Sequence, residues 1–74
     1  MTQCEKIQRH LERFGTITPM DAIMDYGIMR LGARIWDLKA RGVPIKTELV
    51  KGRNRFGEPT RYAKYRLMEE RNNA

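Results

Sequence analysis

The sequence is poor in cysteine, histidine and long apolar runs: one cysteine and one histidine occur among its 74 residues. The lone cysteine, Cys4, excludes an internal disulfide and a zinc site built from several thiolates, which favours a reducing compartment. No apolar run approaches the roughly 20 residues that cross a bilayer. The N-terminal residues also lack the apolar stretch of a secretion signal. We therefore expect a cytoplasmic protein with no membrane partner.

Side chains arranged for catalysis or metal binding are missing as well. The sequence has no glycine-rich phosphate loop, no paired carboxylates in an apolar setting and no serine–histidine arrangement. His10 has no metal-ligand partner at helical spacing, so we expect it at the surface or at the edge of the core. Cys4 lies on an apolar stripe and is interpreted as a small hydrophobic residue. The sequence predicts no enzymatic activity: no catalytic residue, no metal site and no cofactor.

Acidic residues are scarce between residues 51 and 66, although the whole chain has nine of them. This stretch contains one acid, Glu58, and six bases: Lys51, Arg53, Arg55, Arg61, Lys64 and Arg66. Most of the net charge of +6 is therefore located here. A local excess of positive charge favours a polyanion such as a nucleic acid backbone, or an anionic membrane surface. The alternative is a solvated hairpin whose charges only promote solubility.

What the sequence does contain predicts one small folded domain. With 41% hydrophobic and 32% charged residues, the composition suits a folded domain and not a disordered tail. We expect a single domain over residues 1–74, with its core at about 4–68 and a frayed terminus at 69–74.

Apolar residues at three- and four-residue spacing predict a first helix over Gln3–Phe14, which Gly15 ends. Its apolar face is Cys4, Ile7, Leu11 and Phe14. A second helix is predicted over Pro19–Tyr26, because Thr18 can cap it and proline suits its first position. Gly27 ends this helix by adopting a positive φ. The inner face of the second helix is expected to be Ala22, Ile23 and Tyr26.

A third helix is predicted over Met29–Arg41, ending before Gly42. Its core stripe is Ile28, Leu31, Ile35 and Leu38. Trp36, at the edge of the stripe, is expected to pack against neighbouring strands, and Lys39 to lie over apolar surface. Two short helices joined by a glycine turn, the second rich in arginine, are the outline of a DNA-reading helix-turn-helix.

Alternating patterns predict a hairpin after the helices. Thr16–Thr18 is β-branched throughout and is expected to be extended or a very short strand. One longer strand is expected over Val43–Val50 and another over Arg61–Met68. Residues 51–60 between them carry glycine, asparagine and proline, which is typical of a turn. The alternation places Ile45, Thr47 and Leu49 on one side of the first strand, and Ala63, Tyr65 and Leu67 on one face of the second.

The order of these elements predicts an α+β fold, the winged helix-turn-helix: a three-helix bundle followed by a two-stranded antiparallel hairpin, the wing. The run ITPMDAIMDYGIMRLGARIWDLKARGVPIKTE, with a later RYAKYRL, resembles a family of small winged helix-turn-helix proteins common in bacteriophages and prophages. The resemblance covers about residues 7–67. It implies a winged helix-turn-helix fold and, by analogy, binding to DNA.

Candidate base contacts come from the third helix. Its side opposite to the core stripe is expected to carry Met29 and Ala33, with Arg30 close by and Arg34 on the flank. In a major groove Arg30 could bond O6 and N7 of guanine together, and Met29 could touch a thymine methyl. The small side chain of Ala33 would allow close approach to the bases. Arg34 could contact a phosphate or form an ion pair with Asp37, and the sequence leaves both alternatives open.

The wing supplies a second set of candidate DNA contacts: Lys51, Arg53, Asn54 and Arg55. These side chains could contact phosphates or enter a narrow minor groove. Arg61, Lys64 and Arg66 could do the same, or they could be ordinary solvated residues. Thr16 and Thr18, at the start of the second helix, could help to anchor a phosphate, although capping alone explains Thr18.

The leading hypothesis is a double-stranded DNA-binding protein, a phage or prophage transcriptional regulator or accessory factor in the bacterial host cytoplasm. A homodimer would increase specificity. The first helix could provide its seam, or the same face could close the core of the monomer. The competing hypothesis is a phage-encoded interaction module that binds a host protein and not DNA. Single-stranded nucleic acid is a weaker option, because the aromatic residues form no evident stacking platform: Trp36, Phe56, Tyr62 and Tyr65.

Overall fold

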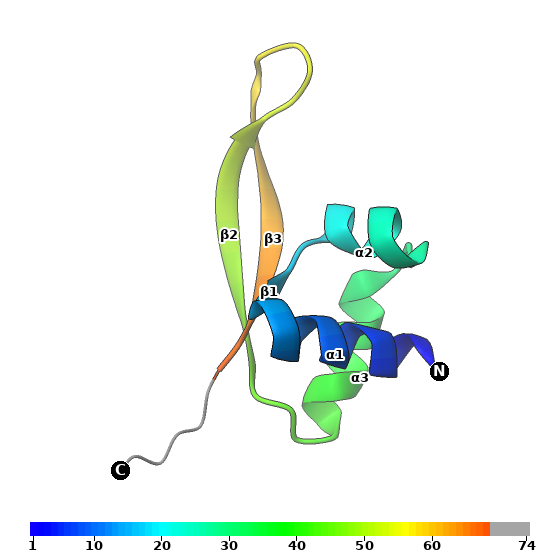
Figure 1. Cartoon of the computed structure of the whole chain (residues 1–74). Coiled ribbons are helices and arrows are strands. Elements are labelled where there is room, and N and C mark those ends of the chain that lie inside the picture. The colour runs from blue at the N-terminus through cyan, green and yellow to red at the C-terminus, as the bar shows by residue number, and fades with distance from the viewer. Residues whose placement is uncertain (69–74) are drawn as a thin grey trace.

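The computed structural model describes residues 1–68, which form three helices beside an antiparallel sheet (Figure 1). The elements, in chain order, are α1 (Gln3–Phe14), β1 (Thr16–Ile17), α2 (Pro19–Tyr26), α3 (Leu31–Ala40), β2 (Ile45–Arg53) and β3 (Pro59–Leu67). The strand order is β1-β3-β2, so the short β1 adds a third strand to the hairpin. The predicted α+β winged helix-turn-helix is confirmed. The terminus that we expected to fray, 69–74, lies outside the described residues.

The predicted bounds of α2, Pro19–Tyr26, are confirmed, and its start has the predicted cap. The hydroxyl of Thr18 accepts a hydrogen bond from the N–H of Asp21, and the N–H of Thr18 donates to the Asp21 carboxylate, each at 3.1 Å. The same reciprocal arrangement starts α1, where Thr2 and Glu5 exchange bonds of 2.7 and 3.1 Å. This pair of reciprocal hydrogen bonds is called a capping box, and each box satisfies two backbone N–H groups that would otherwise lack a partner at the start of a helix.

The turn between α2 and α3 is longer than predicted, and α3 begins two residues late, at Leu31. Gly27 has a φ of +67°, which lets the chain leave α2 in a left-handed conformation. The N–H of Ile28 then donates to the carbonyl of Ala22 at 3.0 Å, so Ile28 still belongs to the end of α2. Arg30 is consequently the residue before α3, with a non-helical φ of −113° and ψ of 61°.

The hairpin is longer, and its tip shorter, than predicted. β2 and β3 pair residue by residue along their whole lengths, which leaves only residues 54–58 in the tip. The ends of the expected turn, 51–60, are therefore strand. Gly52 pairs with Thr60 inside the ladder. Pro59 is the first residue of β3, a position where a strand tolerates the missing N–H.

The core lies between the helices and the sheet. Its buried apolar residues are Cys4, Ile7, Leu11, Ile17, Ala22, Ile28, Leu31, Ile35, Leu38 and Ile45. The predicted core stripe of α3 is confirmed, as is the interpretation of Cys4 as a buried hydrophobic residue. Because Cys4, Ile7 and Leu11 are covered within the monomer, the apolar face of α1 closes the core and is not free to form a dimer seam.

Three predictions of burial were wrong. Phe14, Ile23 and Trp36 were expected inside but are 61%, 43% and 70% exposed. Ile23 and Trp36 each follow a buried residue, and neighbouring residues are about 100° apart around a helix, so the buried stripe is narrower than the apolar pattern suggests. Phe14 is the last residue of α1, and its ring packs on His10 with centroids 4.6 Å apart. His10, expected at the surface or at the edge of the core, is 7% exposed and lies where α1 meets α2. Its Nδ1 atom lies 2.8 Å from the hydroxyl of Tyr26, which satisfies the buried polar group.

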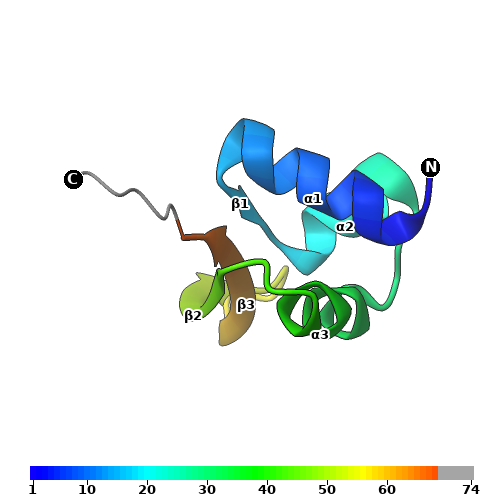
Figure 2. The same cartoon turned by 90° about the horizontal axis from the view of Figure 1, so that it is seen from below.

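The wing extends beyond the helices: it passes α2 and the N-terminal end of α3 (Figure 1). Seen from below, α3 lies beside the hairpin (Figure 2). The Nζ atom of Lys39 on α3 donates to the hydroxyl of Thr47 on β2 at 3.4 Å, which agrees with this arrangement. The third helix and the wing therefore stand side by side.

Candidate nucleic-acid interface

The two faces of the hairpin differ in charge. In a β-ladder, alternate residues share a face, and directly paired residues share it too. We call the face of Thr47 and Tyr65 the helix-side face, because both line a hollow of about 190 Å³ together with residues of α3. It comprises Ile45, Thr47, Leu49, Lys51 and Arg53 of β2, and Pro59, Arg61, Ala63, Tyr65 and Leu67 of β3. No acidic residue is among them.

On the opposite, outer face the bases have an acidic neighbour. Arg66 donates from Nε and Nη2 to the two carboxylate oxygens of Glu48, at 3.2 and 3.3 Å. This hydrogen bonding with Arg66 is the main reason that the pKa of the Glu48 carboxyl lies below its ordinary value. Lys64 pairs directly with Glu48, and Lys46 lies two residues before it. The positive charge of the outer face is therefore partly neutralised, unlike that of the helix-side face.

Lys51 and Arg61 concentrate positive charge on the helix-side face. They are direct partners across the ladder and both are exposed. Like charges in such a pair destabilise a sheet, so the fold gains nothing from this placement. Arg53 follows two residues later on the same face. We call Lys51, Arg53 and Arg61 the basic strip. A polyanion lying along it would relieve the repulsion between its members.

The open side of α3 lies next to the hairpin and is formed mostly by small residues. Gly32 and Ala40 are exposed, Ala33 is half-buried, and Trp36 projects among them with 70% of its surface exposed. The hollow between α3 and the hairpin is lined by Gly32, Ile35, Trp36, Lys39, Thr47 and Tyr65. Trp36 is thus a candidate contact that sequence reasoning missed. The sequence signal for this exposure was the position of Trp36 at the edge of the core stripe. We had interpreted that position as packing against the neighbouring strands.

Met29 and Arg30 lie in the turn before α3 and not on the helix as predicted. Met29 is 79% exposed, and Arg30 is also exposed. The side chain of Arg30 makes no capping hydrogen bond, although its carbonyl accepts the N–H of Arg34 at 3.4 Å. Both residues precede Leu31, where α3 begins, and this is the end of α3 past which the wing rises (Figure 1). Their contact with bases stays a prediction.

Arg34 is engaged within the protein. Its Nε and Nη2 atoms each lie 3.0 Å from the carboxylate of Asp37, so the predicted ion pair is confirmed. Its Nη1 atom also donates to the side-chain oxygen of Gln3 at 3.4 Å. Because the pair is about one-third exposed, it contributes no more than about 1 kcal/mol to stability. A phosphate contact by Arg34 stays a prediction, and it would compete with these bonds.

Asn54 holds the wing tip together. Its side-chain oxygen accepts hydrogen bonds from the N–H of Phe56 at 2.9 Å and of Glu58 at 3.0 Å. Its side-chain nitrogen donates to the Glu58 carboxylate at 2.9 Å. The Glu58 carboxylate is the single acid that the sequence places in this basic stretch, and it is bound inside the turn. Asn54, predicted as a DNA contact, therefore has a structural role that the sequence did not reveal.

The remaining wing residues differ in how free they are. Arg53 donates from Nη1 to the carbonyl of Gly57 at 2.7 Å, which leaves part of its guanidinium for other partners. Within residues 1–68, the side chains of Lys51 and Arg55 form no hydrogen bond or ion pair, and both are exposed. The structure brings Lys51 and Arg53 onto one face with Arg61 and places Arg55 in the tip.

The start of α2 does not favour a phosphate. A hollow of about 620 Å³ separates this helix start from the outer face of the hairpin and includes Thr16 and Thr18 in its lining. However, the Asp21 carboxylate accepts the N–H of Thr18 and places negative charge at the helix end. Capping explains Thr18, and the geometry argues against anchoring of a phosphate by Thr16 and Thr18.

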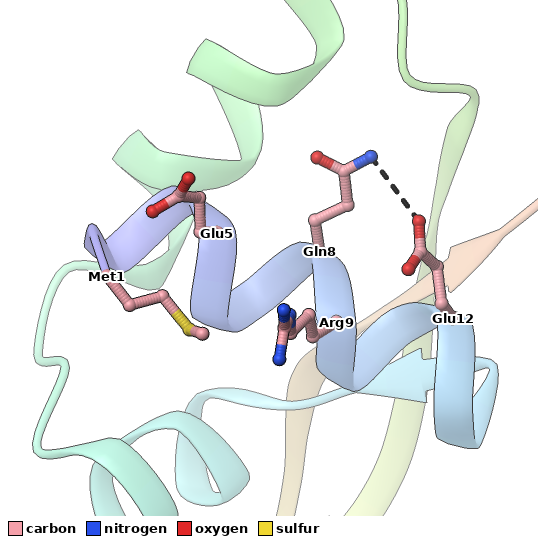
Figure 3. A pocket seen from close by; sticks show the side chains of 5 residues that line it. All are labelled: Met1, Glu5, Gln8, Arg9 and Glu12. Carbon is pink, nitrogen blue, oxygen red and sulfur yellow. Dashed lines mark hydrogen bonds between the residues drawn. The ribbon is translucent and has the colours of Figure 1, made fainter.

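The outward side of α1 has mixed charge. A hollow of about 410 Å³ runs along it and is lined by Met1, Glu5, Gln8, Arg9 and Glu12 (Figure 3). Gln8 donates to the Glu12 carboxylate at 3.5 Å, and the backbone N–H of Thr2 lowers the pKa of Glu5. Two acids beside one base do not favour a polyanion.

In residues 1–68, no cluster of three potential metal ligands and no helix able to span a membrane is found.

A family model described as a winged helix-turn-helix domain matches residues 2–70, nearly all of the chain. No curated protein and no solved structure matches. A winged helix-turn-helix domain indicates binding to double-stranded DNA, which agrees with the charge of the helix-side face.

Proposed function

Because the chain belongs to the winged helix-turn-helix domain family, we propose that it binds double-stranded DNA as a phage or prophage transcriptional regulator or accessory factor. In this proposal it acts in the bacterial cytoplasm and catalyses no reaction. The observation that carries the proposal is the basic strip, Lys51, Arg53 and Arg61, which has no acidic residue on its face. The same face, nearer the base of the hairpin, lines a hollow with α3 through Thr47 and Tyr65.

The two elements have different tasks in the proposed complex. α3 enters the major groove, where the small residues Gly32 and Ala33 allow close approach to the bases. Arg30, at the N-terminal end of α3, donates hydrogen bonds to O6 and N7 of guanine, and Met29 contacts a thymine methyl. The basic strip attracts the phosphates, which positions the protein without reading sequence.

Binding of the protein to a labelled random-sequence duplex, measured by fluorescence anisotropy over a series of salt concentrations, tests the proposal. About four to six phosphate contacts predict a slope of about −4 to −5 in log K against log salt. Affinity that stays flat between low and moderate salt, or no binding at micromolar protein and low salt, would contradict it.

Two variants with the same change in charge test where the DNA lies. Lys51→Ala removes a charge from the helix-side face, and Lys46→Ala removes one from the outer face. We expect Lys51→Ala to weaken binding and to reduce the salt slope by about one, with a smaller effect for Lys46→Ala. Equal effects would mean that net charge alone matters, and would refute the assignment of DNA to the helix-side face.

A phage-encoded module that binds a host protein in place of DNA is the second candidate. It is favoured by the exposed apolar side of α2, where Met20, Ile23 and Met24 are 64%, 43% and 74% exposed. Exposed methionines adapt readily to protein partners. Absence of duplex binding, together with capture of a host protein that a Met20→Ser, Met24→Ser variant loses, would favour this candidate.

The proposal that the protein binds DNA also includes a homodimer on the duplex. One winged helix buries only about 600–1,000 Å² of surface on DNA. A second copy about one helical turn away would add specificity. Sedimentation of the protein alone and with duplex measures the number of copies bound, and a single copy on every duplex would contradict the homodimer.

A further inference from the structure

Phe56 is held at the far end of the wing by a turn that is closed on itself. Its N–H donates to the Asn54 side chain at 2.9 Å, and the N–H of Gly57 donates to the Asn54 carbonyl at 3.0 Å. Gly57 adopts a φ of +79°, which favours glycine and fixes the reversal. The Phe56 ring nevertheless remains 78% exposed. An ordered backbone thus presents an apolar ring to solvent, far from the core.

The surroundings of the ring indicate the chemistry of its partner. Arg55 precedes it, and the basic strip leads up to it along the helix-side face. Such a ring fits a partner that is anionic outside and apolar inside, which describes the phosphates and stacked bases of duplex DNA. Proteins that bind the minor groove insert phenylalanine and other apolar side chains between base steps, and so kink the duplex. An anionic lipid surface has similar charge, but binds chiefly amphipathic helices with a broad apolar face.

The reach of the wing agrees with a minor-groove position. Thr47 lies beside α3, with its hydroxyl 3.4 Å from the Nζ atom of Lys39. Arg53, the last residue of β2, is six residues further on, which is about 20 Å at about 3.3 Å per residue. A major groove and the neighbouring minor groove are about 17 Å apart along the axis, half of the helical repeat. α3 runs back alongside this strand for about 12 Å from Lys39 to Leu31, so Arg53 lies beyond the end at which the chain enters the helix. The tip extends further still, toward the minor groove that neighbours the major groove occupied by α3.

We propose that Phe56 is a wedge that enters this minor groove and partly unstacks one base step, while Arg55 contacts the adjacent phosphates. The inference rests on the proposed function, because it requires α3 to be on the duplex. Pyrimidine–purine steps such as TA are the easiest to unstack. The wing would then select DNA by deformability as well as by charge, and would add sequence preference at positions that α3 does not touch.

A short alternating A·T duplex, with 2-aminopurine in place of the adenines of one strand, tests the wedge in any register. The emission of 2-aminopurine rises when its stacking is lost, and anisotropy of an end label measures affinity in the same samples. We expect the wild type to raise the emission on binding. Phe56→Ala should abolish the rise and weaken binding by about tenfold. Phe56→Leu, which keeps an apolar wedge, should retain most of the rise.

The control is Met24→Ala, which removes another exposed apolar side chain, 74% exposed, from α2. It should leave both signals unchanged. If Phe56→Ala binds this duplex and raises the emission like the wild type, the wedge is refuted while the proposed function stands. If the wild type itself does not bind the duplex, the proposed function fails and the wedge fails with it. Binding to phosphatidylglycerol vesicles that Phe56→Ala loses, with duplex binding intact, would assign the ring to a lipid surface and refute the wedge.

Discussion

The Nδ1 atom of His10 lies 2.8 Å from the hydroxyl oxygen of Tyr26, so a polar contact inside the fold ties α1 to α2. The two rings meet edge to face, with centroids 5.6 Å apart, and the Phe14 ring packs on His10 at 4.6 Å. Phe14 thus covers the histidine although most of its own surface is exposed. The orientation of α2, and with it the turn that leads into α3, depends in part on this group of rings.

Tyr26→Phe tests the contribution of the hydrogen bond. The variant keeps the ring but leaves a buried nitrogen of His10 without its partner. We expect the free energy of unfolding to fall by about 1–3 kcal/mol. Each kcal/mol corresponds to a decrease of about 4–8 °C in Tm for a domain of this size. Urea denaturation followed by circular dichroism measures the change. Tyr62→Phe, on the outer face of the wing, is the control, and equal losses in the two variants would contradict the prediction.

Lys51→Glu should have opposite effects on stability and on DNA binding. The variant replaces a like-charge pair with Arg61 by an ion pair across the ladder. We expect it to stabilise the protein by about 0.2–1 kcal/mol in urea denaturation at low salt. DNA binding should weaken, because the basic strip then contains an acid. A loss of stability would show that the like-charge pair does not destabilise the fold. Unchanged affinity for duplex would show that the basic strip does not bind DNA.

Arg30→Ala separates base contacts from phosphate contacts. On a preferred duplex selected from a random pool, we expect a loss of about 1–3 kcal/mol in binding free energy, with a much smaller loss on random duplex. Arg41→Ala, at the other end of α3, is the matched control. Anisotropy titrations on both duplexes give the comparison. If affinity falls equally on the two duplexes, Arg30 contacts the backbone and not a base.

Stability should decrease in acid because of the Glu48–Arg66 pair. The hydrogen bond with Arg66 lowers the folded-state pKa of Glu48 below 4.5. The contribution of this pair is therefore fully present above the unfolded pKa and is lost as the pH falls through the folded value. Glu48→Gln should be less stable than wild type at neutral pH, and the difference should vanish in strong acid. In an Arg66→Ala background the pH-dependent effect of the same substitution should be much smaller, because only Lys46 and Lys64 then favour the charged carboxylate. An undiminished effect would refute this cause.

Much of the fold could be predicted because its signals are local. Thr18 and Gly27 fix the ends of α2 through bonds within a few residues, and the stripe of Leu31, Ile35 and Leu38 identifies the buried side of α3. The start of α3 was misplaced because Ile28, an apolar residue in phase with that stripe, is held by the end of the preceding helix. Apolar spacing alone does not distinguish these two situations.

The candidate site was less predictable, because its members meet through pairing and long-range contacts. The opposition of Lys51 and Arg61 depends on the register of the hairpin, which a ten-residue polar segment, 51–60, left open. The sequence left the position of His10 open between the surface and the edge of the core, because its partner, Tyr26, is 16 residues away. Asn54 was assigned to DNA because nothing in the sequence shows that its amide closes the tip.

The exposed indole of α3 makes the protein its own optical reporter. Trp36 is the only tryptophan in the chain, and its ring is already largely in water in the folded state. Denaturation should therefore shift its emission very little, whereas any macromolecule that covers this helix should quench or shift it. Intrinsic fluorescence would then follow occupancy of the helix without a dye and almost without interference from unfolding.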